Sequence, residues 1–198
     1  MDSNLKFMHI VWYQYLQLFC LLTTLFYRRG LQAYSIELFI PLLVLINAVE
    51  IIGNNYQTWG WKDNYFFYNY YLLCSAPLWL LLYKRMLPLT RQTEVVYNSI
   101  SVLTMILLLL NYFFFQGRQQ FNTYSLVLMM LLMIVFSCII LFTITIQDNL
   151  KASLFDYPYF WINASNLLFS MVTLVLLGLQ PFILANKLQI GYRTLYHA

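Results

Sequence analysis

The sequence predicts an all-α fold, a polytopic transmembrane helical bundle with six spans. Of its 198 residues, 62% are hydrophobic and only 9% are charged, whereas a soluble domain carries about 25% charged residues. Six apolar stretches also reach the length of about 20 residues that a helix needs to cross the hydrocarbon core. The strand alternation of a β-barrel is absent. These observations argue against a soluble enzyme, a nucleic-acid-binding module and a disordered tail.

The predicted spans are separated by short connections with helix breakers or charged residues. The first span ends in Tyr27-Arg28-Arg29, whereas a removable signal peptide begins with its positive charge, so we expect this span to be retained. The later connections fall at 53–55, 84–91, 116–118 and 147–158. The spans therefore lie near 5–27, 34–53, 65–83, 95–115, 122–146 and 160–184.

We expect these spans to form one bundle over residues 1–185, followed by a polar tail over 186–198. The tail is too short to cross a membrane. Its apolar residues, among them Leu188, Ile190 and Leu195, are typical of an interfacial segment or of the start of a seventh helix. A chain truncated before that seventh helix is therefore one of the expectations.

The basic residues between the spans predict the orientation of the chain. One set of loops contains Arg28, Arg29, Lys84, Arg85, Arg91 and Lys151, whereas the opposite set contains Lys62 and Arg118. The positive-inside rule places the richer set in the cytoplasm and both termini outside. We therefore expect an integral membrane protein whose richer set of basic loops lies in the cytoplasm. The net charge of +4 is divided among these loops, so no nucleic-acid partner is expected.

Polar residues recur at steps of three or four in four of the predicted helices, so each set shares a helix face. In lipid such faces turn inward. They either hydrogen-bond neighbouring helices, at about 0.6–2 kcal/mol each, or line a site for a ligand or water. The candidate ligand- or pore-lining residues are His9, Tyr13, Gln17, Asn47, Glu50, Asn98, Asn111, Asn163 and Asn166.

Glu50 is the most informative of these candidates. It lies about one turn from the end of the second predicted helix, and Asn47 shares its face. A carboxylate at this depth is either interfacial or paired inside the bundle. His9 and Lys6 are conceivable partners, and Gly53 would let another backbone approach. The alternative to a functional role is that the Glu50 side chain only extends toward the membrane interface.

Catalytic and metal-binding patterns are missing from the sequence. There is no His-Glu-x-x-His, Gly-x-Ser-x-Gly or glycine-rich phosphate loop. Cys20, Cys74 and Cys138 lie in three different apolar stretches, without Cys-x-x-Cys spacing. We expect no catalytic residue, metal or cofactor, which leaves an enzyme as the less favoured class.

Three short motifs resemble a known group of proteins. They are Glu50-Ile51-Ile52-Gly53, Tyr68-Asn69-Tyr70-Tyr71 and Phe160-Trp161-Ile162-Asn163. In these motifs the chain resembles small integral membrane proteins of Bacteroidota with six or seven helices, a group with no assigned activity. Ser75 stands where that pattern has an acidic residue, and the seventh helix is lacking. The resemblance implies the helical architecture alone.

The function we expect is that of a sensor or accessory subunit. Its polar core would bind a small ligand or lipid, and it would act through a protein partner or a homo-oligomer, in contact with membrane lipids. The alternative is an oligomeric channel, transporter or membrane-permeabilising effector. Pro41, Pro77 and Pro181 do not form the matching halves that are typical of transporters. A lipid-modifying enzyme is the third possibility.

Overall fold

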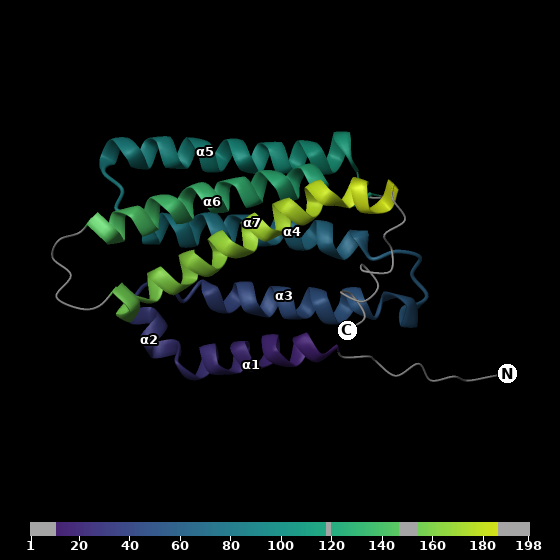
Figure 1. Ribbon diagram of the computed structural model, residues 1–198, viewed down its shortest axis with the longest axis horizontal. Helices are drawn as coiled ribbons and strands as arrows, with labels where there is room; N and C mark the ends of the chain where they lie inside the picture. Colours follow the sequence, from purple (N-terminus) through teal and green to yellow (C-terminus); the bar gives the residue numbers. More distant parts are fainter. Residues whose placement is uncertain (1–10, 118–119, 147–153, 186–198) are drawn as a thin grey trace. The chain divides into compact units, whose positions relative to one another are not determined.

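The computed structural model of the chain describes residues 11–117, 120–146 and 154–185 (Figure 1). Every regular element in these ranges is a helix, which confirms the predicted all-α class. The helices divide into two compact units, Met1–Leu126 and Val127–Ala198. Each unit is therefore treated separately below. The predicted tail over 186–198 lies outside the described residues.

The first unit begins with an antiparallel pair of helices, α1 (Trp12–Phe26) and α3 (Phe39–Asn54). A short helix, α2 (Arg28–Ala33), joins them (Figure 1). The boundaries predicted from the sequence are wrong here, because residues 28–33, which lie between the first two predicted spans, form α2, and α3 begins at Phe39 and not at residue 34. The amide of Leu31 donates to the carbonyl of Tyr27 at 3.2 Å, so the helical hydrogen bonding resumes at once.

The next two helices are α4 (Tyr65–Met86), which packs against α3, and α5 (Arg91–Leu110). A 3-10 turn, η1 (Tyr56–Trp59), leads from α3 toward α4 and ends at Gly60, whose φ of 75° suits glycine. The π-helical turn η2 (Asn111–Phe115) extends α5. Helix α6 (Thr123–Ile146) then begins in the first unit and continues into the second.

The second unit contains the rest of α6, the 3-10 turn η3 (Leu154–Asp156) and helix α7 (Pro158–Ala185). Each of the six predicted spans thus corresponds to a described helix. Among the described residues, three helical stretches are long and apolar enough to cross a membrane, namely Arg91–Phe115, Thr123–Ile146 and Pro158–Leu179, so six crossings remain a prediction. Helix α3 is apolar but shorter, and α4 has the length but is rich in tyrosine.

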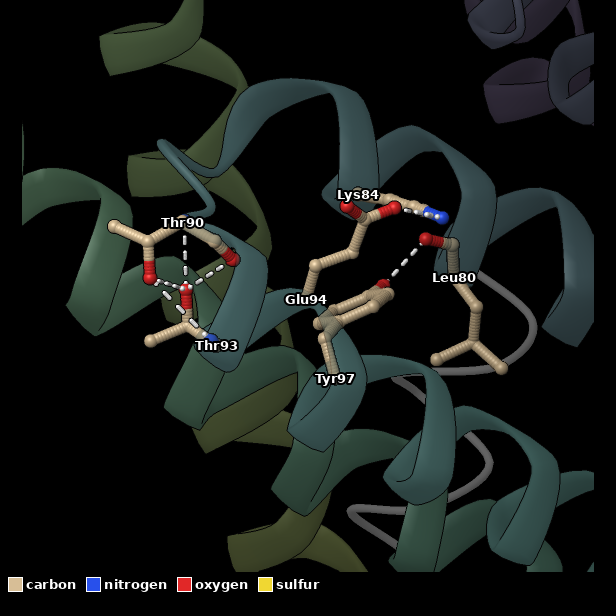
Figure 2. Close-up of polar contacts among 6 residues, drawn as sticks. All are labelled: Leu80, Lys84, Thr90, Thr93, Glu94 and Tyr97. Carbon is tan, nitrogen blue, oxygen red and sulfur yellow. Dashed lines mark hydrogen bonds and ion pairs between the residues drawn. The ribbon is translucent and has the colours of Figure 1, made fainter.

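Two ion pairs tie together the helix ends beside the loop from α4 to α5. Lys84 Nζ lies 2.9 Å from Glu94 Oε1, which joins α4 to α5 (Figure 2). Arg85 pairs with Glu37, which joins α4 to the residues before α3. Thr90 also caps α5 by accepting a hydrogen bond from the Thr93 amide. Two of the basic residues that predict the orientation are therefore paired with carboxylates.

Acidification is expected to weaken the Glu37–Arg85 connection. Glu37 precedes α3, and hydrogen bonds from its own backbone amide and from Arg85 lower the pKa of its carboxyl below the ordinary value of 4.5. A lowered folded-state pKa means that this stabilisation is complete above the unfolded value and is lost as pH falls through the folded one. The thermal midpoint in detergent should therefore fall further between about pH 6 and about pH 3 for the parent than for Glu37→Gln. Equal losses would show that the pair adds no stability.

At the opposite end of the first unit, Asn69 holds the connection between α5 and α6. Its Nδ2 donates to the Gln120 carbonyl at 2.8 Å, and its Oδ1 accepts from the Asn122 amide at 2.9 Å. Beside it, Asn111 Nδ2 donates to Ser125 Oγ at 2.8 Å. We call Asn69, Asn111, Asn122 and Ser125 the loop clamp. All four are buried, so these bonds pair polar groups that water does not reach.

Candidate functional site: a glutamate among tyrosines

Helix order and direction place Glu50 among residues of two other helices. Glu50 lies on α3, four residues before the helix ends at Asn54. Tyr13 is near the start of α1 and Tyr68 is near the start of α4. Because α3 is antiparallel to both neighbours, its C-terminal end meets their N-terminal ends (Figure 1). The three side chains therefore meet at one end of the first unit.

Two tyrosine hydroxyl groups hydrogen-bond the Glu50 carboxylate. The Tyr13 hydroxyl donates to Glu50 Oε2 at 3.0 Å, and Asn54 Nδ2 donates to the Tyr13 oxygen at 2.7 Å. The Tyr68 hydroxyl also hydrogen-bonds the carboxylate. Tyr71 lies close enough to Glu50 to interact with its charge. We call Glu50, Tyr13, Tyr68, Tyr71 and Asn54 the Glu50 site.

Close packing at Gly53 positions the Tyr68 ring. A Cβ added to Gly53 would lie 3.1 Å from the ring and hydroxyl atoms of Tyr68, which is tighter than ordinary contact. The Gly53 carbonyl accepts a hydrogen bond of 3.2 Å from Asn64 Nδ2. We expected Gly53 to admit another backbone, but the group that approaches it is the ring of Tyr68. Any larger residue at position 53 would therefore require the Tyr68 ring to shift by a few tenths of an ångström.

The partners of Glu50 differ from those of the other described glutamates. Glu37 and Glu94 each form an ion pair with a basic residue. Glu50 is half-buried, and no lysine, arginine or histidine in the described part of the chain pairs with it. Lys6 and His9, the partners considered from the sequence, lie outside the described residues. The charge of an ionised Glu50 is therefore balanced only by hydroxyl dipoles within the described ranges.

Buried amide groups extend the polar region along the contact between α1 and α3. Gln14 is 1% exposed and Asn47 is 4% exposed. Asn47 Nδ2 donates to the Leu43 carbonyl at 2.7 Å and approaches the Gln17 carbonyl at 3.5 Å. Within the described residues, Gln14 Nε2, Gln17 Oε1 and Asn47 Oδ1 have no hydrogen-bond partner. Each such buried group costs about 1–3 kcal/mol.

The structure brings four of the nine candidates together, namely Tyr13, Gln17, Asn47 and Glu50. Asn98 is exposed on α5, and Asn111 belongs to the loop clamp. His9 lies outside the described residues.

Asn163 and Asn166 lie on α7 in the second unit. Asn163 is 0% exposed and donates to the Tyr159 carbonyl of its own helix at 2.7 Å, whereas Asn166 is half-buried. The expected bonds of these two residues to neighbouring helices remain a prediction.

Sequence reasoning missed three residues of this region, Gln14, Tyr68 and Tyr71. Gln14 lies three residues before Gln17, so the helical spacing that made Gln17 a candidate applies equally to Gln14. Tyr68, Tyr71 and Ser75 follow one another at steps of three and four on α4. This pattern is visible in the sequence, but Tyr68 and Tyr71 enter the sequence analysis only as part of the motif Tyr68-Asn69-Tyr70-Tyr71.

The described residues contain no group of three or more histidine, cysteine, aspartate or glutamate side chains that could hold a metal ion. The chain matches no protein-family model, and neither the curated proteins nor the solved structures contain a significant match.

Proposed function

We propose that this protein is a non-catalytic integral membrane sensor or accessory subunit that binds a small polar ligand or a lipid at the Glu50 site. The observation that supports this proposal is a half-buried carboxylate whose described partners are hydroxyl groups. A charged side chain at the centre of a membrane helix costs about 2.5–3.5 kcal/mol, and less toward the interface. A bound ligand of complementary charge would offset this cost.

The buried amides between α1 and α3 support the same proposal. Gln14 and Asn47 offer a donor and an acceptor that are unused among the described residues. Because α1 and α3 each supply part of the site, a ligand there would alter how the two helices pack. The helix ends and connecting loops are then the surfaces through which a partner protein or a second copy would sense occupancy.

Loss of a bound molecule on replacement of Glu50 tests this function. Glu50→Gln keeps the shape of the side chain and removes its charge. The parent, purified in mild detergent, should retain a small molecule or lipid that Glu50→Gln loses by about tenfold, as measured by native mass spectrometry. Asn98→Leu, on the exposed face of α5, is the matched control and should retain it.

Two results would contradict this function. One is an identical set of retained molecules in the parent and in Glu50→Gln, provided that both proteins fold. The other is ion flux through vesicles that depends on Asn163 and Asn166, because it would favour the oligomeric pore.

The proposed topology has six crossings, both termini outside and the basic loops in the cytoplasm of a bacterial cell, with the protein in the inner membrane. In a background without Cys20, Cys74 and Cys138, single cysteines at positions 30, 88 and 118 report the side of each loop. A membrane-impermeant thiol reagent should label 118 in intact cells, and label 30 and 88 only after the membrane is opened. Labelling of all three positions from one side would contradict six crossings.

A further inference from the structure

The charge of the Glu50 site limits the class of ligand that it suits. The site contains one carboxylate, and within the described residues it belongs to no group of three or more acidic, histidine or cysteine side chains that could hold a metal ion. Hard divalent cations prefer several oxygen ligands, usually with more than one carboxylate. A ligand with a single positive charge is the better match to one glutamate.

The aromatic residues favour an organic cation over a simple ion. Tyr13 on α1 and Tyr68 on α4 supply two phenol rings next to the carboxylate, and Tyr71 follows Tyr68 by three residues on α4. Aromatic faces attract ammonium groups, and phenol oxygens accept hydrogen bonds from N–H donors. The Tyr13 oxygen already accepts an N–H hydrogen bond, from Asn54. An ammonium group with N–H hydrogens can use both the carboxylate and these oxygens, whereas a quaternary ammonium can use only charge and the rings.

The position of the site near a helix end suits contact with lipid headgroups. Glu50 lies four residues before the end of α3, which is about 6 Å along the helix axis. Exposed Trp59 and Trp61 follow this helix end, with ring centroids 4.9 Å apart. Tryptophan concentrates at the boundary between hydrocarbon and headgroups. The carboxylate is therefore placed where a headgroup amine could reach it.

We propose that the Glu50 site binds a primary ammonium group, which would lie against the Glu50 carboxylate and the hydroxyls of Tyr13 and Tyr68. This inference rests on the proposed function and adds the class of ligand. The same chemistry is present in an ethanolamine lipid headgroup and in a free small amine. The experiment below distinguishes the two sources.

The test compares lipids that differ only in the headgroup. The full chain is delipidated and reconstituted into phosphatidylglycerol nanodiscs that contain either phosphatidylethanolamine or phosphatidylcholine, and bound lipid is counted by native mass spectrometry. The parent should retain about ten times more phosphatidylethanolamine than phosphatidylcholine, and Glu50→Gln should retain the two lipids equally. Displacement by free ethanolamine would identify a site for free amines, and retention in its presence would identify the lipid headgroup. Equal retention of the two lipids by the parent would overturn the proposal.

A second variant keeps the test decisive if Glu50→Gln does not fold. The double variant Tyr13→Phe with Tyr68→Phe preserves the carboxylate and the rings but removes both hydroxyls. Its preference for phosphatidylethanolamine over phosphatidylcholine should fall several-fold, and Asn98→Leu should behave as the parent. An unchanged preference in the double variant would overturn the assigned role of the hydroxyls. If the ligand that depends on Glu50 has no amine, this inference is wrong but the proposed function stands. If ligand retention does not depend on Glu50, both are wrong.

Discussion

Replacing Asn69 with leucine is expected to lower the free energy of unfolding by about 2–4 kcal/mol, the largest stability effect we foresee. Asn69 is 0% exposed, and its side chain bonds the backbone of Gln120 and Asn122. Leucine has the same branched shape but is bulkier and cannot form either hydrogen bond, so the buried amide of Asn122 would lose its partner. Denaturant unfolding in detergent, followed by circular dichroism, measures the change.

The control for this prediction is the same substitution at an exposed asparagine. Asn98 is exposed on α5, and Asn98→Leu should change the free energy of unfolding by no more than about 0.5 kcal/mol. If Asn69→Leu costs no more than Asn98→Leu, the loop clamp does not stabilise the connection between α5 and α6.

Gly53→Val should both destabilise the first unit and disturb the Glu50 site. The added Cβ alone would lie 3.1 Å from Tyr68, whose hydroxyl hydrogen-bonds Glu50, so the Tyr68 ring has to shift. Such overpacking costs about 1–3 kcal/mol. We expect a lower unfolding midpoint in detergent together with weaker ligand retention.

Gly178→Val is the matched control, because Gly178 also lies in an apolar helix and a Cβ there meets nothing within 4 Å. Valine at this position should leave stability unchanged or slightly improved, since glycine is the poorer helix former. If both valine variants behave alike, Tyr68 is free to adjust and Gly53 does not position it.

The sequence alone was sufficient to predict the all-α fold class, and it identified Glu50 as a candidate whose role remains a prediction. An apolar run of about 20 residues has few other ways to bond its backbone in lipid, so each predicted span corresponds to a helix. The short helix α2 was missed because Arg28 and Gly30 indicate a break, whereas backbone hydrogen bonds continue through them. Glu50 was recognisable because a carboxylate near the end of an apolar helix is costly and therefore rare.

Only the tertiary structure showed which polar residues meet. Helical periodicity shows that Tyr13 and Gln17 share a face, but it does not reveal which helix lies opposite. The antiparallel packing of α1 and α4 against α3 brings Tyr13 and Tyr68 to Glu50. Asn98, on α5, is exposed. Spacing along one helix is a local property, whereas a site shared by three helices depends on contacts between residues far apart in the chain.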